Sequence, residues 1–285
     1  MFVIGRGSVQ QDECDVMGHM NVRHYVTRAL DGLRWLLFEA GLPPGAGGFV
    51  LHDQHIRFLR ELPPGAPFTL VGGVVEQRGL ILRTLVEIRH SATGEPAATL
   101  VSDIEPESRP RDVDALRVVL PDHAAPRGLP FDPPRPLPDY RAGLAMGLVE
   151  CHRGVVRASD CEADGVMRPD GVIARVWDGI PNLRNGGRGV GVKSDKIGGA
   201  ALEYRLVHLK PLRAGQLVTV SSGLRAIGSK TTTWTHVMHD GETGEAVAAA
   251  EAVGVALDLV ARKAIVLPPE RRAALEAILV PGLGL

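Results

Sequence analysis

Carboxylate, imidazole and amide side chains gather in a short segment near the start of the chain, where their spacing suits acyl chemistry. Asp15, Gly18, His19 and Asn21 stand directly before a helix-like run at residues 22–40. A carboxylate near a polarised carbonyl can orient a water molecule for attack, or attack directly. A glycine at a helix entrance permits close backbone approach, and the free amides of the first turn point a positive field outward. The segment therefore predicts attack on a carbonyl, with Asp15 as base or nucleophile and Gly18 with the following amides holding the oxyanion.

His19 and Asn21 have supporting roles in this interpretation. His19 is expected to donate a hydrogen bond to the substrate carbonyl or to Asp15. Asn21 stands where a helix N-cap would stand, so capping and catalysis are equally open for it. An aspartate before a helix is also often a cap, but Gly18 and His19 in the same segment favour catalysis for Asp15.

The same segment returns in altered form in the middle of the chain. Positions differ by a constant 147 through the helix, as between Cys14 and Cys161, Gly18 and Gly165, and Asp31 and Asp178. They differ by 150 in the later strands, as between Gly65 and Gly215. A match through polar, glycine and turn positions is not expected from two segments that share only a hydrophobic period. The sequence therefore predicts two copies of one module, at residues 1–122 and 149–285, joined by a proline-rich linker at residues 123–148.

The second copy changes the chemistry of the motif. Glu162 replaces Asp15, while Val166 and Arg168 replace the histidine and the asparagine. Glu162 can be a second base on a longer stem, but the two other replacements favour a decayed or repurposed site. Arg168 and Asp170 are expected to pair as a salt bridge at the surface.

Both copies predict the same order of elements: a strand, the motif turn, one long helix, a loop and four strands. In the first copy the helix at residues 22–40 carries an apolar stripe, and Gly41 ends it. The strands of this copy are predicted at residues 2–10, 49–61, 68–75, 80–89 and 97–104, and the later strands of the second copy at 202–209, 217–224, 231–238 and 246–257. Short turns between the last three strands of each copy predict antiparallel neighbours.

This arrangement resembles the hotdog fold. The first copy is similar to the 4-hydroxybenzoyl-CoA thioesterase-like and acyl-ACP thioesterase-like branch, whose motif contains an acidic residue, Asp, Gly-His and Asn before the helix. Matching residues are Glu13, Asp15, Gly18, His19 and Asn21, with Tyr25 at the aromatic position one turn into the helix. The resemblance implies an α+β chain of two hotdog modules, each a five-stranded antiparallel sheet wrapped around one long helix. It also implies that the modules pair as an intrachain pseudo-dimer, with the acyl pocket at their interface.

The activity implied by this resemblance is metal-free hydrolysis of an acyl-CoA or acyl-ACP thioester, without a cofactor. One alternative is a non-catalytic protein that binds or senses acyl-CoA, which the altered second motif favours. A hydratase or dehydratase fits less well, because that group presents Asp and His five residues apart, whereas Asp15 and His19 are four apart. Cations near the second strands are candidates for contacts to the phosphates of the substrate, against the commoner role of solubilising strand ends: Arg57, Arg60, Arg205, Lys210 and Arg213.

Composition and net charge exclude further functional classes of protein. The chain has 285 residues, of which 45% are hydrophobic and 23% charged, as in a soluble globular protein. A net charge of −1 gives no footprint for non-specific nucleic-acid binding. Because the start lacks a basic head followed by a long apolar stretch, we expect a cytoplasmic protein with no membrane partner, and a homodimer is compatible with this organisation.

Other patterns in the sequence give only weak signals for metal, disulfide or phosphate chemistry. The chain has three cysteines, too few for a disulfide framework, and the equivalent positions of Cys14 and Cys161 predict a small buried side chain in both copies. The pairs His52/His55 and His236/His239 lie three residues apart in predicted strands, which places each pair on opposite faces. The glycine-rich run at residues 187–194 lacks the Gly-Lys step and the preceding strand of a phosphate loop, and is expected to be a loop between helix and strand.

Overall fold

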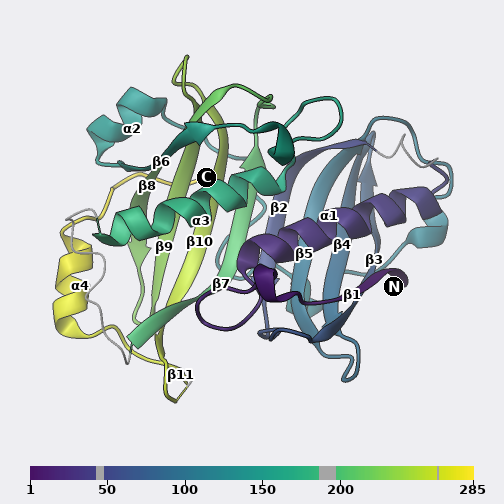
Figure 1. Ribbon diagram of the computed structural model, residues 1–285, viewed down its shortest axis with the longest axis horizontal. Coiled ribbons are helices and arrows are strands. Elements are labelled where there is room, and N and C mark those ends of the chain that lie inside the picture. Colours follow the sequence, from purple (N-terminus) through teal and green to yellow (C-terminus); the bar gives the residue numbers. More distant parts are fainter. Residues whose placement is uncertain (43–47, 186–196, 262) are drawn as a thin grey trace. The chain divides into compact units, whose positions relative to one another are not determined.

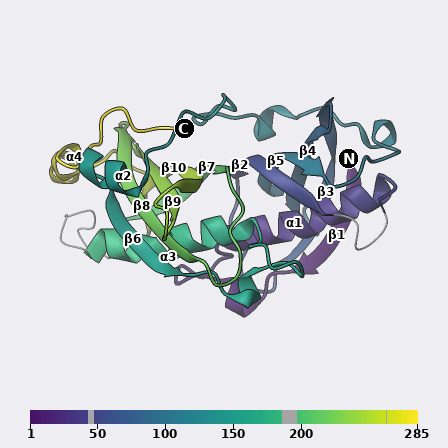
Figure 2. The same cartoon turned by 90° about the horizontal axis from the view of Figure 1, so that it is seen from above.

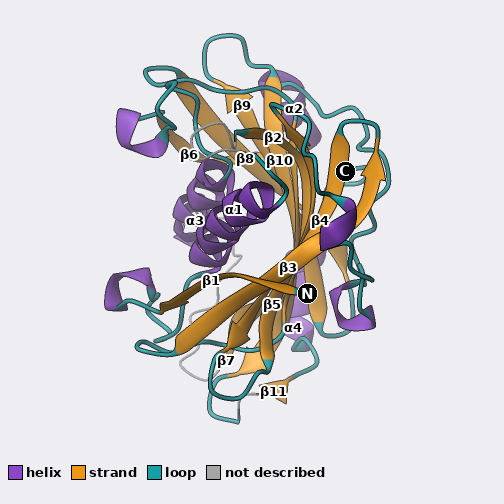
Figure 3. Ribbon diagram, turned by 90° about the vertical axis from the view of Figure 1, so that its right-hand side faces the viewer, coloured by secondary structure: helices purple, strands orange, loops and turns teal. Residues whose placement is uncertain are grey.

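The chain divides into two compact units, Met1–Phe131 and Asp132–Leu285. The computed structural model describes residues 1–42, 48–185, 197–261 and 263–285 (Figure 1). The glycine-rich run at residues 187–194 lies outside the described residues. Each unit, taken by itself, is an antiparallel sheet with one long helix on one of its faces (Figures 1 and 3).

The described residues of the first unit form one α-helix, which has five turns, and five strands. The elements are β1 (Phe2–Ser8), α1 (Val22–Glu39), β2 (Phe49–Phe58), β3 (Pro67–Arg78), β4 (Ile81–His90) and β5 (Pro96–Pro106). Their order in the sheet is β1-β3-β4-β5-β2, with every neighbouring pair antiparallel. The prediction that the last three strands are antiparallel neighbours is therefore confirmed.

The second unit repeats this plan and adds three elements. The repeated elements are β6 (Val149–Val155), α3 (Asp170–Asn185), β7 (Ile197–His208), β8 (Leu217–Ile227), β9 (Thr231–Asp240) and β10 (Ala246–Asp258). The order β6-β8-β9-β10-β7 is that of the first unit (Figure 2). The additions are α2 (Tyr140–Met146), β11 (Lys263–Ala264) and α4 (Pro269–Glu276). Both units thus have the predicted hotdog fold, and sequence periodicity missed the three added elements.

The α1 helix follows directly from the pattern of its residues. All eight residues of its predicted apolar stripe are buried: Tyr25, Val26, Ala29, Leu30, Leu33, Leu36, Leu37 and Ala40. Gly32 lies on the same face, where a Cβ atom would stand 3.2 Å from Ile4 Cδ1. The glycine therefore lets the helix approach the sheet closely. After the last turn, Gly41 adopts a φ of 86°, a left-handed conformation that ends the helix.

The prediction of buried cysteines in the motif is wrong. Cys14 and Cys161 are both only partly buried. Each thiol donates to the carbonyl four residues earlier, with Cys14 Sγ 3.5 Å from Gln10 O and Cys161 Sγ 3.3 Å from Arg157 O. Cys14 and Cys161 are therefore equivalent because each forms the same local hydrogen bond in its motif turn, and not because each is packed in a core.

A chain of buried polar groups crosses the second sheet beneath α3. Cys151 Sγ lies 3.2 Å from Ser222 Oγ, and Ser222 Oγ lies 2.7 Å from His236 Nδ1. Burial lowers the pKa of His236 from 6.5 to about 4. The folded protein therefore holds this imidazole uncharged where the unfolded chain would bind a proton.

This linkage predicts a loss of stability in acid. Because the folded-state pKa is below the unfolded one, the contribution is fully present above pH 6.5 and is lost as the pH falls toward about 4. Between about pH 7 and about pH 4.5, His236 is expected to account for about 2 kcal/mol of the fall in unfolding free energy. Urea unfolding of the wild type and of His236→Val at both pH values measures it. An equal fall in both proteins would contradict the assignment.

None of the described helices is long and apolar enough to cross a membrane.

Candidate active site

The motif of the first unit forms a tight turn between β1 and α1. Asp15 N donates to His19 O at 3.0 Å, and Gly18 N donates to Asp15 O at 3.0 Å. Gly18 has a φ of 79°, and a Cβ atom added to it would meet nothing within 4 Å. The glycine is thus needed for its backbone conformation and not for packing. Its own amide is engaged within the turn.

Asp15 is held by one of its two carboxylate oxygens. Oδ1 accepts a hydrogen bond from Met17 N at 2.8 Å and lies 3.8 Å from His19 Nδ1. Oδ2 accepts no hydrogen bond from any described residue, and the side chain is 14% exposed. One oxygen therefore fixes the orientation of the carboxylate while the other is available to a water molecule or a substrate.

His19 joins Asp15 to a third group that lies far away in the sequence. His19 Nε2 lies 3.3 Å from Glu61 Oε1, in the turn that follows β2. This turn is fastened to the motif because Met20 N donates to Leu62 O at 2.8 Å. Glu61 was missed by sequence reasoning, since no spacing rule connects it to the motif.

The backbone amide of His19 donates to no acceptor in the part of the chain that the structure describes. It is the first amide after the Gly18 bend, just ahead of the start of α1. A free N–H near a helix N-terminus, beside a half-free carboxylate, can hold an oxygen atom that gains negative charge.

Asn21 and Tyr25 are buried residues that build the start of the helix. Asn21 Oδ1 accepts from Arg23 N at 3.1 Å, the geometry of an N-cap. Tyr25 donates its hydroxyl to Arg60 O at 3.5 Å and packs edge-on against Phe58, with ring centroids 5.4 Å apart. Burial raises the pKa of Tyr25. Both side chains therefore support the turn that carries Asp15.

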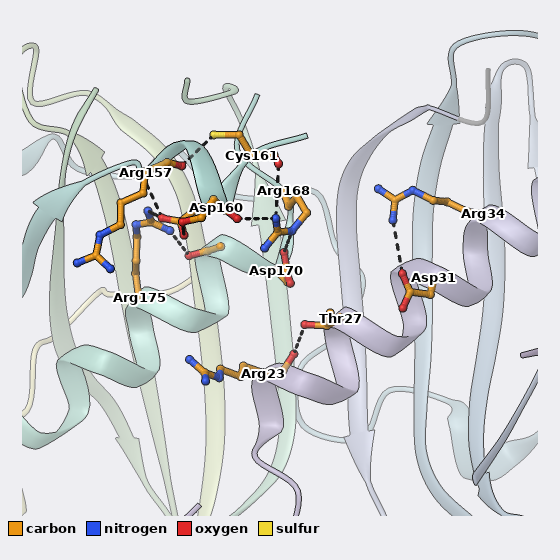
Figure 4. Close-up of polar contacts among 12 residues, drawn as sticks. Arg23, Thr27, Asp31, Arg34, Arg157, Asp160, Cys161, Arg168, Asp170 and Arg175 are labelled. Carbon is orange, nitrogen blue, oxygen red and sulfur yellow. Dashed lines mark hydrogen bonds and ion pairs between the residues drawn. The ribbon is translucent and has the colours of Figure 1, made fainter. Parts of the chain in front are cut away.

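An ion pair anchors the motif turn to the helix in each unit. Glu13 Oε1 lies 2.7 Å from Arg28 Nη2 in the first unit. In the second, Asp160 Oδ2 lies 2.8 Å from Arg175 Nη2 (Figure 4). These residues occupy equivalent positions in the repeat, since 160 − 13 and 175 − 28 both equal 147. The acidic residue at the start of the motif thus serves the architecture of the turn.

The second unit has the same turn, but the amide equivalent to that of His19 is hydrogen-bonded. Gly165 N donates to Glu162 O at 3.0 Å, as in the first unit. Val166 N, the equivalent of the His19 amide, donates to Asp164 Oδ1 at 2.9 Å. Met17 stands at the position of Asp164 in the first copy and offers no carboxylate there. Glu162 therefore lies in a turn whose counterpart of the His19 amide is already bonded.

Other substituted positions of the second motif are also engaged. Arg168 Nε lies 3.3 Å from Asp170 Oδ1, so the predicted pair forms (Figure 4), but Asp170 is buried and the pair is not the surface salt bridge that the sequence predicted. Arg168 also donates to Ser159 O at 2.9 Å. Pro211 takes the position of Glu61, because its neighbour Leu212 accepts from Met167 as Leu62 does from Met20. The second turn thus lacks counterparts of both His19 and Glu61.

The predicted phosphate-binding cations all contact protein groups. Arg57 Nη1 donates to Asp122 O at 3.4 Å and to Ala125 O at 3.1 Å. Arg60 pairs with Glu95 at 2.6 Å, and Lys210 pairs with Glu245 at 2.6 Å. Arg205 is buried and donates to Asp132 O. A role in phosphate binding stays a prediction, and it would require these contacts to be exchanged. Among the described residues, no three His, Cys, Asp or Glu side chains are placed to hold a metal ion.

Residues 9–105, which include the whole first motif, match the sequence model of the thioesterase-like superfamily. No curated protein sequence matches the chain.

Three solved structures share the fold across both units. A Lactobacillus plantarum protein assigned as an oleoyl thioesterase is 14% identical, with a TM-score of 0.65 and coverage of 88% of this chain and 94% of that one. The 12:0-ACP thioesterase from Umbellularia californica is 12% identical, with a TM-score of 0.63 and coverage of 88% and 93%. An acyl-ACP thioesterase from Bacteroides thetaiotaomicron is 10% identical, with a TM-score of 0.60 and coverage of 88% and 96%.

Proposed function

We propose that the chain hydrolyses the thioester bond of an acyl-CoA or an acyl-ACP, as the match of residues 9–105 to the thioesterase-like sequence model suggests. The observation that carries the proposal is the pairing of a half-free carboxylate with an open amide. Asp15 Oδ2 and the His19 N–H have no partners among the described residues, and both belong to the same turn. A base and an oxyanion donor are the two groups that hydrolysis of a thioester needs.

In the proposed reaction, Asp15 Oδ2 takes a proton from a water molecule whose oxygen attacks the thioester carbon. The electron pair of the carbonyl bond moves to the carbonyl oxygen, which the His19 N–H and the positive end of α1 stabilise. Collapse of the tetrahedral intermediate breaks the C–S bond, and the leaving thiolate recovers the proton from Asp15. The products are a carboxylic acid and a free thiol. The alternative route, in which Asp15 attacks directly, passes through an anhydride that water then opens.

Glu61 and His19 are proposed to position the reacting groups. The contact of Glu61 Oε1 with His19 Nε2 at 3.3 Å orients the ring, and Nδ1 then lies 3.5 Å from Met20 O and 3.8 Å from Asp15 Oδ1. Met17 N completes the support at 2.8 Å from the same carboxylate oxygen. An oriented carboxylate loses less entropy when the transition state forms.

Release of thiol from purified full-length protein tests the proposal. The panel comprises short, medium, long and aromatic acyl groups, each on CoA and on acyl carrier protein. Thiol release from at least one member, with matching carboxylic acid, is the expected result. Saturable binding without any release would instead support the acyl-CoA-binding alternative, and loss of an enoyl double bond would support the hydratase.

The two motif glycines offer a matched pair of variants. Gly18 has a φ of 79° and Gly165 a φ of 81°, so Gly18→Ala and Gly165→Ala each place a Cβ on a left-handed backbone. Nothing lies within 4 Å of either new Cβ. Each is expected to cost about 1 kcal/mol of stability through backbone strain. Only Gly18→Ala should also slow thiol release, by about tenfold, because it shifts the turn that holds Asp15 and the open amide. Thermal melts and initial rates measure the two effects, and equal rates for both variants would contradict the assignment to the first turn.

A further inference from the structure

The second unit contains a cavity of about 160 Å³ between the later half of α3 and its own sheet. Its wall is largely aromatic and aliphatic, and it includes Trp177, Tyr204, Trp234, His236, Leu267 and Leu275. No residue of either motif turn lines it. The cavity therefore shares no residue with the candidate active site, and its proposed role does not depend on the thioesterase proposal.

One polar side chain of this wall is backed by the buried chain of hydrogen bonds. Nδ1 of His236 is hydrogen-bonded to Ser222 Oγ at 2.7 Å, and Ser222 Oγ is in turn hydrogen-bonded to Cys151 Sγ at 3.2 Å. With Nδ1 occupied, Nε2 is the ring nitrogen left for a molecule in the cavity. The His236 side chain is buried, and burial lowers its pKa to about 4, so the ring is uncharged near neutral pH. An uncharged imidazole suits a neutral hydrogen-bonding group better than an anion.

The first unit shows that the fold does not need this polar chain. By the repeat offsets, Cys151, Ser222 and His236 correspond to apolar or side-chain-free positions in the first unit: Ile4, Gly72 and Val86. The strand registers agree, because Gly72 faces Val86 as Ser222 faces His236. There, Ile4 Cδ1 fills the space, 2.7 Å from where a Cβ on Gly72 would stand. The second unit thus has buried polar groups where the first has packed apolar contacts. Their mutual hydrogen bonds satisfy Ser222 and Nδ1 of His236, whereas Nε2 of His236 has no partner among the described residues and loses its hydration unless a ligand replaces it.

Size and shape restrict the molecule that fits. A cavity of about 150 Å³ with an apolar lining is known to accommodate benzene. The faces and edges of Trp177, Trp234 and Tyr204 favour an aromatic ring. If Ser222 Oγ donates to Nδ1 of His236, then Nε2 carries the ring proton and is a donor. If Nδ1 donates to Ser222 Oγ, then Nε2 is an acceptor. A hydroxyl group meets both cases because it donates and accepts.

We propose that the cavity of the second unit binds a small uncharged aromatic molecule with one hydroxyl group, a phenol, whose hydroxyl bonds to Nε2 of His236. Arg271 also lines the cavity, so an aromatic carboxylate is the competing ligand that the test must separate.

Phenol, benzene and benzoate are titrated into the full-length protein, with tryptophan fluorescence and the melting temperature as readouts. Trp177 and Trp234 both line the cavity and report its occupation. Phenol is expected to bind saturably, with benzene about fivefold weaker for want of the hydrogen bond. His236→Val should bring phenol down to the affinity of benzene. The matched control is His239→Val, because His239 is buried in the same strand, contacts Pro138 O at 3.3 Å and does not line the cavity.

Equal affinity for phenol and benzene, tighter binding of benzoate, or no saturable binding of phenol would each overturn the proposal. A loss of phenol binding in His239→Val as large as in His236→Val would also overturn it. If His236→Val does not fold, the comparison of phenol with benzene on the unaltered protein decides the hydrogen bond by itself.

Discussion

Replacement of Asp15 by asparagine is expected to lower the rate of thiol release by at least about 100-fold, the usual contribution of a positioned base. The amide keeps an oxygen for the hydrogen bond from Met17 N, which is 2.8 Å from Oδ1, so the turn should retain its shape. It removes the free oxygen that would take the proton from water. Initial rates with the best substrate of the panel, together with a thermal melt, separate lost chemistry from lost folding.

Glu162→Gln is the matched control for this variant, because Glu162 holds the equivalent position in the second turn. Its neighbouring amide, Val166 N, is already bonded to Asp164 Oδ1 at 2.9 Å. Thiol release should therefore be unchanged in Glu162→Gln. Undiminished release in Asp15→Asn would remove Asp15 from the mechanism, and comparable losses in both variants would show that both turns are active.

Glu251→Ala is expected to cost the second unit about 3 kcal/mol of stability. The Glu251 carboxylate is 3% exposed and receives Arg225 Nη1 on both oxygens, at 3.0 and 2.9 Å. Thr235 Oγ1 donates to it at 2.9 Å and Leu285 N at 3.2 Å. Removal of the carboxylate leaves the buried Thr235 Oγ1 and Leu285 N without this acceptor and deprives the half-buried Arg225 of its partner, and chemical denaturation measures the cost.

The exposed pair of Lys210 and Glu245 provides the comparison. Its atoms are only 2.6 Å apart, but both side chains are more than half exposed, at 55% and 59%. Glu245→Ala should therefore change the unfolding free energy by less than about 1 kcal/mol. Similar losses in Glu251→Ala and Glu245→Ala would show that burial of the Glu251 network adds no stability.

The long helix and its ends were predictable because their causes are local. The apolar period of α1 fixes its buried face, Asn21 caps its first turn and Gly41 ends its last one. The antiparallel neighbours β3, β4 and β5 were predictable for the same reason, since short turns join them. In contrast, α4 has little apolar character of its own, and its burial depends on packing against β8, which no periodicity reports.

Glu61 and the open amide depend on contacts between distant residues or on the exact course of a turn. Glu61 comes 42 positions after His19, as 61 − 19 shows, and only the fastening of Met20 to Leu62 brings it there. The sequence did carry one signal for the closed second turn. An aspartate two residues before a turn amide commonly accepts from that amide, and Asp164 has this spacing to Val166, where the first copy has Met17 before His19.

The bond from Val166 to Asp164 also bears on how the two copies diverged. After a duplication, an unused copy is free to drift, and most drift weakens a fold. Exchange of a methionine for an aspartate at this one position instead supplies an acceptor for a bare amide. On the proposed mechanism, the residue at this position decides between an amide that is bonded within the turn and one that is open to an oxyanion, so the open amide of the first copy has a cost in local stability.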